Sequence, residues 1–340
     1  MSVKKSGDLP KVAVLACGGT IAGVGEEGRS AGYTPGVLDV ESVLDSCPGL
    51  DALAQISAYQ VCNVNSDDMT ASIWLELASR IEQLAAQDVD GFVVLHGTDT
   101  MEETAFFLDL VLKTAKPVVL TGSMRSATAV GADGPANLYA AVAVAACAQS
   151  VGRGVQVVFD GGIYPARWVN KVSTSSLSAF DGGDFGSAGS VSDGAATYFT
   201  PACVRPKLCG SFALSDMHDL PQVIVLDFHV DANPALVHAA ADIASGIVLA
   251  GAGAGQMSIP FAAALEQLSI PVVVASRVQR GGVGAGPLLC ANGISAGSLS
   301  SCKAAVLLRL ALSQGCSAPE IDSMFASLAA RQATGPLSGV

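Results

Sequence analysis

The chain has 340 residues, of which 50% are hydrophobic and 14% are charged, so it can bury a large core and is not a disordered protein. Its formal net charge is −12, and it has no lysine- or arginine-rich stripe that could neutralise phosphates. These features exclude nucleic acid and anionic membrane as expected partners and favour a small molecule. The length favours two domains.

The nine cysteines are scattered, without Cys-x-x-Cys pairs or clusters with histidine, so neither a disulfide framework nor a metal site is expected. The glycine-rich stretches fit neither the dinucleotide-binding nor the P-loop spacing, so no cofactor is expected. The first apolar run is too short for a secretory signal, and no run reaches the 18 or so residues that span a bilayer. We therefore expect a cytoplasmic protein with reduced thiols.

Short β-branched runs alternate with helical segments through the first half of the chain. The pattern predicts strands buried on both faces at 11–17, 56–64, 91–97, 117–122 and 154–160. Apolar residues recur every three or four positions over 70–87, which predicts an amphipathic helix there. This alternation is typical of a parallel sheet covered by helices.

A second α/β unit is predicted from about residue 221. Its expected strands are 222–229, 246–253 and 271–278, and its expected helices are 234–245, 259–269 and 302–315. Residues 181–220 are rich in glycine, serine and proline with little periodicity, which indicates a loop followed by a linker. We place an N-terminal domain at 1–199, a linker at 200–221 and a C-terminal domain at 222–340.

Hydroxyls and carboxylates follow the first three predicted strands. Thr20 comes after the first, Ser66 and Asp67 come after the second, and Thr98 and Asp99 come after the third. The carboxyl ends of parallel strands meet at one edge of a sheet, where ligands bind. These side chains are therefore expected to lie close together.

Local structure offers a simpler reading of the same residues. Thr100 with Glu103 has the spacing of a capping box, and the segment 66–68 has the composition of an N-cap for a helix beginning near residue 69. Glycine before Thr20 can serve backbone geometry alone. His96 follows buried-strand residues, so packing is a better explanation for it than metal binding. Capping does not account for Thr98.

Threonines in such a cluster can perform nucleophilic catalysis. A threonine hydroxyl attacks a carbonyl only if a base takes its proton and donors stabilise the oxyanion. Lys171, a lone lysine in the hydroxyl-rich "VNKVSTSS", is a candidate for that base.

The stretches "LACGGTIAG" and "HGTDTMEETAFFLDL" resemble the two signatures of the bacterial-type L-asparaginase family, which includes the glutaminase-asparaginases. The similarity extends to "TGSMRSATAVGADGPANLYAAV", "NKVSTSSLSAF" and "KAAVLLRLAL", so it covers nearly the whole chain. The resemblance implies a larger N-terminal domain with a mostly parallel sheet and a smaller flavodoxin-like C-terminal α/β domain. It also implies a homotetramer.

By this resemblance, Thr20 is the nucleophile that forms a β-aspartyl ester, and Tyr33 on a loop beside it assists proton removal. Thr98, Lys171 and Asp99 resemble a second triad, in which the lysine polarises the threonine and the aspartate holds the substrate's α-amino group.

The resemblance also assigns substrate-binding residues, with three departures from the family pattern. Ser66 is similar to the residue that holds the α-carboxylate. Asp67 replaces a longer glutamine or glutamate that reads the α-amino group, and Gln256 replaces an asparagine that comes from a partner subunit. Residues 277–291 contain no acidic side chain to support Tyr33.

The expected function is hydrolysis of L-asparagine, with minor activity on L-glutamine. The alternatives are a glutaminase-asparaginase of broad specificity, an amidase for a larger substrate such as the tRNA-amidotransferase subunit of archaea, and a non-catalytic amino-acid-binding protein of the same fold.

Overall fold

The computed structural model describes residues 9–29, 32–202, 208–284 and 290–329. The chain divides into two compact units, Met1–His218 and Asp219–Val340. In the described part of the chain, no helix is both long and apolar enough to cross a membrane.

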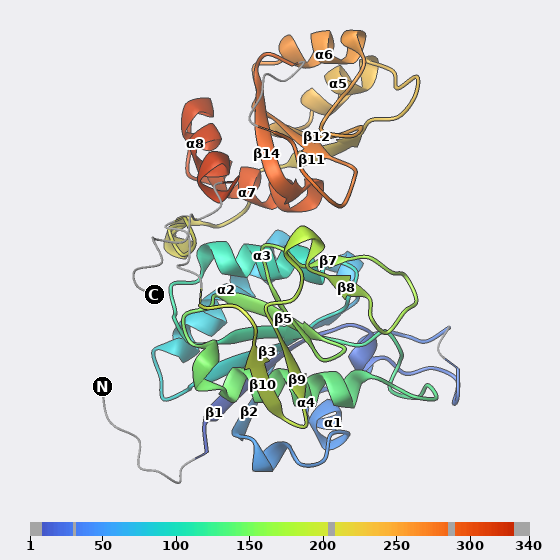
Figure 1. The fold of residues 1–340 in the computed structure, drawn as a ribbon, viewed down its shortest axis with the longest axis vertical. Coiled ribbons are helices and arrows are strands. Elements are labelled where there is room, and N and C mark those ends of the chain that lie inside the picture. Colours follow the sequence, from blue (N-terminus) through green and yellow to red (C-terminus); the bar gives the residue numbers. More distant parts are fainter. Residues whose placement is uncertain (1–8, 30–31, 203–207, 285–289, 330–340) are drawn as a thin grey trace, which may run out of the picture. The chain divides into compact units, whose positions relative to one another are not determined.

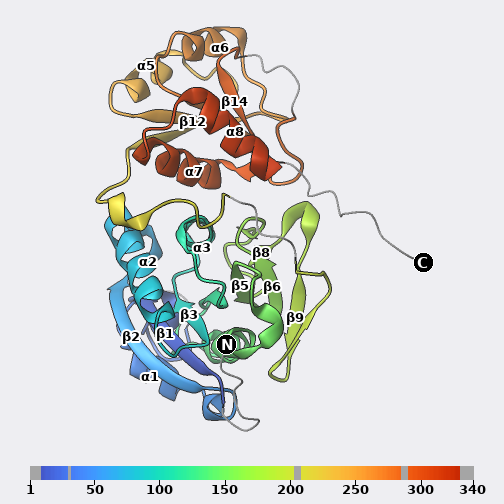
Figure 2. The ribbon, with the colours of Figure 1, turned by 90° about the vertical axis from the view of Figure 1, so that its left-hand side faces the viewer.

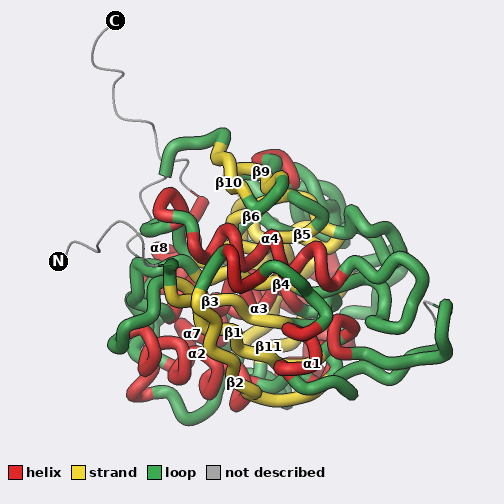
Figure 3. Tube along the Cα trace, turned by 90° about the horizontal axis from the view of Figure 1, so that it is seen from below, coloured by secondary structure: helices red, strands yellow, loops and turns green. Residues whose placement is uncertain are grey.

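The first unit is built on an eight-stranded sheet with the order β10-β9-β6-β5-β4-β3-β1-β2, which can be followed in Figure 3. The five parallel strands are those predicted from the sequence: β1 (Lys11–Gly18), β2 (Gln55–Val64), β3 (Gly91–Leu95), β4 (Val118–Thr121) and β5 (Val155–Phe159). The antiparallel strands are β6 (Gly162–Pro165), β9 (Gly189–Ser192) and β10 (Ala195–Tyr198). β2 and β3 lie on opposite sides of β1, so the strand order reverses there and the topological switch point lies at β1.

Helices cover both faces of this sheet (Figure 1). One face carries α1 (Val40–Asp45) and α4 (Gly134–Ala146), which pack on the even-numbered side chains of β1. The other carries α2 (Ala71–Ala85) and α3 (Met101–Val111). Because both faces are covered, every residue of β3, β4 and β5 is buried.

A separate hairpin consists of β7 (Asn170–Lys171) and β8 (Phe180–Asp181), which form their own two-stranded sheet. Short 3-10 turns of this unit lie at Thr20–Ala22, Leu50–Ala52, Ser66–Asp68, Ala148–Ser150, Gly183–Phe185 and Leu214–Asp216.

The second unit has a four-stranded parallel sheet in the order β11-β12-β13-β14. Its strands are β11 (Val223–Asp227), β12 (Gly246–Gly251), β13 (Val272–Ser276) and β14 (Gly293–Ser300). Figure 2 shows α5 (Ala235–Ala241) and α6 (Ile259–Glu266) on one face of this sheet, with α7 (Ser301–Ser313) and α8 (Ala318–Ala329) on the other. The predicted fold class, a larger mostly parallel α/β unit followed by a smaller α/β unit, is confirmed.

Three local predictions are wrong. β2 is not buried on both faces, because it is the edge strand of the sheet and its residues are exposed or half-buried. The region 181–220 is not only loop and linker, because it contains the β9–β10 hairpin. The segment 66–68 does not cap a helix: it forms its own 3-10 turn, and the hydroxyl of Thr70 caps α2 by accepting from the Ile73 N–H at 3.3 Å.

Candidate active site

A Gly-Gly-Thr turn at the end of β1 brings Thr20 against the end of β3. Gly18 and Gly19 have φ angles of +99° and +85°, a region that glycine adopts without strain. A Cβ on Gly19 would lie 2.4 Å from the Cα of Gly97, so the two strand ends touch backbone to backbone. Thr20 and Thr98 each follow a glycine of this contact, and they are 6% and 5% exposed. The glycines therefore bring two buried threonines to one edge of the sheet.

Ser66, directly after β2, is hydrogen-bonded to the end of β3. The Asp99 N–H donates to the Ser66 Oγ at 3.2 Å, and the Thr100 hydroxyl donates to the Ser66 carbonyl at 2.7 Å. Thr100 is the N-cap residue of α3, but its side chain makes no cap hydrogen bond. The predicted capping role of the Thr100 hydroxyl is therefore wrong, because this hydroxyl is used to join two strand ends.

Tyr33 reaches Thr20 from the segment that follows the turn. Its hydroxyl lies 2.7 Å from the Thr20 Oγ1, and either atom can be the donor. A Cβ on Gly23 would lie 2.8 Å from the tyrosine ring, and a Cβ on Gly25 would lie 2.8 Å from the Tyr33 Cβ. The glycines thus leave room for the tyrosine to pack closely beside the threonine.

Lys171, in β7, reaches the end of β3 with its ammonium group. The Nζ donates to the Thr98 Oγ1 at 2.8 Å and to the Asp99 Oδ1 at 2.5 Å. The lysine side chain is 15% exposed, whereas that of Asp99 is 64% exposed. Since an ammonium group only donates, the Thr98 oxygen must accept, and its own proton is left to point elsewhere. Asp99 meanwhile keeps a solvent-facing carboxylate.

A buried hydrogen-bonded chain supports the end of β3 from behind. The His96 Nδ1 lies 2.7 Å from the Gly97 carbonyl, which can only accept, so this nitrogen carries the proton. The Nε2 then accepts from the Thr104 hydroxyl at 2.9 Å, and that oxygen accepts from the Trp74 indole N–H at 2.8 Å. Burial lowers the pKa of His96 to about 4. The histidine is therefore neutral and structural, as the sequence indicated.

Two of the predicted substrate-binding residues, Asp67 and Gln256, take no part in the hydrogen bonds described above for the strand ends. Asp67 is exposed in the 3-10 turn beside Ser66. Gln256 belongs to the second unit, where it is exposed in a tight turn that exchanges backbone hydrogen bonds with Ala252 at 2.7 and 2.8 Å. The structure thus groups Thr20 with Tyr33 and groups Thr98, Asp99 and Lys171.

One contact was missed by the sequence reasoning. The Glu102 carboxylate, in the first turn of α3, accepts a hydrogen bond from the backbone N–H of Lys171 at 2.5 Å. In the sequence, Glu102 has the spacing of a cap with Asp99, and nothing local shows that it binds a residue 69 positions away.

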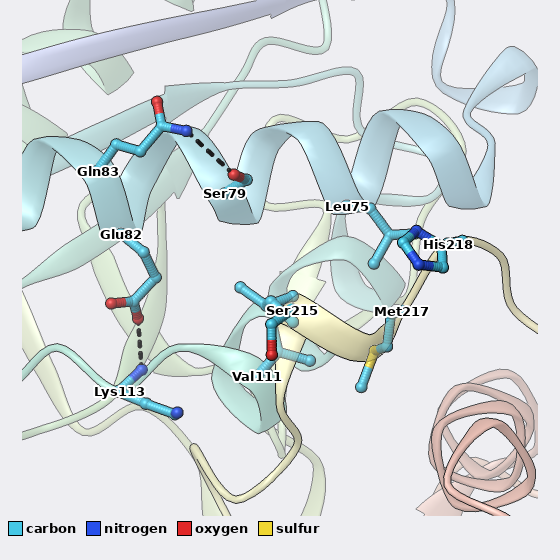
Figure 4. A pocket seen from close by; sticks show the side chains of 10 residues that line it. Leu75, Ser79, Glu82, Gln83, Val111, Lys113, Ser215, Met217 and His218 are labelled. Carbon is cyan, nitrogen blue, oxygen red and sulfur yellow. Dashed lines mark hydrogen bonds between the residues drawn. The ribbon is translucent and has the colours of Figure 1, made fainter.

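A pocket of about 480 Å³ lies elsewhere on the first unit, between α2 and the segment 214–218. Figure 4 shows Glu82 accepting from the Lys113 backbone N–H at 2.5 Å, with Met217 and His218 on the far side. This pocket contains none of the strand-end hydroxyls. Among the described residues, no group of three or more histidines, cysteines, aspartates and glutamates could hold a metal ion.

Family models match both parts of the chain. Residues 11–203 match the model "Asparaginase, N-terminal", and residues 222–325 match the model "Glutaminase/Asparaginase C-terminal domain". The chain belongs to the asparaginase family.

Relatives of this asparaginase-family chain are similar over nearly their full length. It is 37% identical to "L-asparaginase 2" of Escherichia coli over 327 residues, which cover 93% of each chain. It is also 37% identical to "Probable L-asparaginase periplasmic" of Haemophilus influenzae, with 92% of each chain covered. A crystal structure of "Probable Cytoplasmic L-asparaginase" from Campylobacter jejuni has a TM-score of 0.89 and 37% identity, with 94% of this chain and 99% of that chain covered.

Proposed function

We propose that this asparaginase-family protein is an L-asparaginase, which hydrolyses the side-chain amide of L-asparagine to L-aspartate and ammonia. The observation that carries the proposal is the pair of hydroxyl contacts at adjacent strand ends, Thr20 with Tyr33 and Thr98 with Lys171. Family membership and the names of the relatives support it. The proposed steps use side chains and water alone.

In the proposed first step, the Thr20 oxygen attacks the carbon of the side-chain amide. A threonine hydroxyl is a weak nucleophile at neutral pH and needs a partner that takes its proton. Tyr33, at 2.7 Å, is the partner that supports this assignment. The proton passes to the departing nitrogen, which leaves as ammonia, and Thr20 retains a β-aspartyl ester. Water then cleaves the ester and releases aspartate.

Thr98 and Lys171 form the second proton-handling pair of the proposal. The lysine holds the Thr98 oxygen as an acceptor, so the threonine proton can be directed at the reacting group or at the attacking water. This arrangement supports a role for Thr98 in general acid–base catalysis. It does not compete with Thr20, because each threonine has its own partner.

The substrate's α-amino and α-carboxylate groups need charged or polar partners. We assign Asp99 to the α-amino group, since its carboxylate is exposed as well as paired with Lys171. We assign Ser66 to the α-carboxylate, because it lies at the same cluster of strand ends. Asp67 completes the proposed amino-group site, and Gln256 contributes from a partner subunit in a homotetramer.

Asparagine is the proposed better substrate, with glutamine hydrolysed at a lower rate. A single methylene is worth about 1–3 kcal/mol of discrimination in a pocket of fixed shape, so small changes in the anchor alter the preference. Asp67 is shorter than the residue expected at its position and lies exposed beside Ser66, which supports a loosely fixed amino-group anchor. The broad-specificity glutaminase-asparaginase is the competing reading.

The proposal extends to domains and compartment. A catalytic domain at 1–199, a linker at 200–221 and a second domain at 222–340 are supported by the compact units that end at His218 and begin at Asp219. A cytoplasmic location is supported by the name of the Campylobacter jejuni structure and by six free cysteines among the described residues, which are Cys17, Cys47, Cys62, Cys147, Cys290 and Cys316. The relative from Haemophilus influenzae carries a periplasmic name.

Ammonia release tests the activity. The wild-type protein is incubated with asparagine, with glutamine and without substrate, and ammonia is measured over time. We expect release from asparagine above that from glutamine, and both above the blank. Binding of asparagine without ammonia release would contradict the proposal and favour a non-catalytic binding protein. Thr20→Ala should abolish release while aspartate still binds, whereas near-normal release would contradict the assignment of the nucleophile.

A further inference from the structure

We infer that Glu102 is a positioning residue for Lys171, and the inference rests on the proposed function. Its carboxylate accepts from the Lys171 backbone N–H at 2.5 Å, while the Lys171 Nζ contacts Thr98 and Asp99. One short stretch of chain, from the end of β3 to the first turn of α3, therefore binds this lysine at both ends.

The need for such a contact follows from the topology. Lys171 lies in β7, which pairs with β8 in a hairpin separate from the eight-stranded sheet. The next amide in the chain, that of Val172, donates to Ala179 within the hairpin at 2.8 Å. Since successive residues of a strand point to opposite sides, the Lys171 N–H lies on the edge of β7 that faces away from β8, and the Glu102 carboxylate occupies that edge.

The contact fixes the origin of a long side chain. A lysine has four rotatable side-chain bonds, so its ammonium group is well placed only when both its backbone and its tip are held. A hydrogen bond to a charged acceptor is roughly twice as strong as a neutral one. Reacting groups displaced by about 1 Å can lose about a hundredfold in rate. Loss of the Glu102 contact should therefore lower kcat without removing any group that binds substrate.

The test uses three substitutions of Glu102 in the full-length protein. Glu102→Gln keeps a carbonyl acceptor of the same reach, Glu102→Asp keeps the charge but shortens the reach, and Glu102→Ala removes the acceptor. We expect kcat for asparagine to fall about 10- to 100-fold in the Ala and Asp variants, with KM within about threefold of wild type. The Gln variant should stay within about threefold of wild-type kcat.

Glu41→Ala is the matched control. Glu41 is an exposed carboxylate at the second position of α1, as Glu102 is at the second position of α3, so its removal costs the same helix-dipole interaction without touching Lys171. We expect wild-type kcat and KM from this variant. A matching loss of kcat in Glu41→Ala would overturn the inference.

A second readout does not depend on activity. Hydrogen–deuterium exchange of a peptide spanning 168–176 should be faster in Glu102→Ala and Glu102→Asp than in wild type, and unchanged in Glu41→Ala. Unchanged exchange in all variants, or an unchanged kcat in Glu102→Ala, or a Gln variant as slow as the Ala variant, would overturn the inference. An inactive wild-type protein would instead refute the proposed function, and exchange would still report whether Glu102 holds β7.

Discussion

Tyr33→Phe isolates the contribution of one hydroxyl to the proposed chemistry. The tyrosine oxygen lies 2.7 Å from the Thr20 Oγ1, and the ring packs against Gly23, where an added Cβ would come within 2.8 Å of it. Phenylalanine fills the same ring position, so the substitution deletes the oxygen and leaves the packing unchanged. Any change in rate then reports proton handling at Thr20.

The size of the effect follows from the position of the threonine. Thr20 is only 6% exposed, so water has little access to replace the missing hydroxyl. General acid–base groups contribute about 10²- to 10⁴-fold, and we expect Tyr33→Phe to lower kcat by about a thousandfold. That factor corresponds to about 4 kcal/mol of transition-state stabilisation. KM should change by less than about threefold, because the substrate's charged groups bind elsewhere.

Ammonia release over a range of asparagine concentrations gives kcat and KM separately. Tyr59→Phe is the control, since Tyr59 lies in β2 beneath Arg80 and contacts neither threonine through any hydrogen bond found among the described residues. A Tyr33→Phe protein whose kcat stays within threefold of wild type would refute the proton-handling role of this tyrosine.

Three further predictions concern stability, thiol reactivity and specificity. Burial lowers the pKa of His96 from 6.5 to about 4, so the contribution of the neutral histidine to stability is full above pH 6.5 and is lost as the pH falls toward 4. In urea unfolding, the free energy of unfolding of the wild type should therefore fall by about 2 kcal/mol by pH 5 relative to that of His96→Gln. Parallel pH profiles of the two proteins would contradict this. Hydrogen bonding between the two thiols lowers the pKa of Cys62, whereas the same hydrogen bond, together with burial, raises the pKa of Cys17. Iodoacetamide should therefore label Cys62 before Cys17 in peptide mass spectrometry, and equal labelling of the two would argue against it. Asp67→Glu should change the ratio of kcat/KM for asparagine and glutamine, and equal scaling of both substrates would exclude a role in specificity.

The strand-end cluster could be predicted because two simple regularities act together. Buried parallel strands appear as apolar runs, and their carboxyl ends must lie on the same edge of the sheet. Thr20 and Thr98 each follow such a run within a few residues, and Ser66 follows β2, which is the parallel edge strand beside β1. Their proximity therefore follows from the strand positions alone, and the glycine contact between the ends of β1 and β3 makes it close.

The antiparallel half of the sheet could not be predicted in the same way. β9 and β10 read "GSVS" and "AATY", with half-buried or exposed residues at most positions, so they lack the continuous apolar run that indicates a buried strand. They form a hairpin at the edge of the sheet, where pairing with β6 supplies their order. Tertiary contact decides the conformation of such segments, because their own sequence favours a loop equally well.

The first turn of α3 shows why part of the site was misread. Thr100 with Glu103, and Asp99 with Glu102, have the residue types and spacing that cap a helix, and a local hydrogen bond usually forms first because it closes the shortest loop. Here one member of each pair binds a distant backbone group instead: the Thr100 hydroxyl donates to the carbonyl of Ser66, and the Glu102 carboxylate accepts from the N–H of Lys171. The first amides of α3 therefore receive no hydrogen bond from the Thr100 side chain, whereas the segments at Ser66 and Lys171 are fixed beside the site. A sequence pattern shows which hydrogen bonds these side chains can make, whereas the fold determines which partners they bind. Residues that break a local rule beside a cluster of buried hydroxyls are therefore the ones to test by substitution.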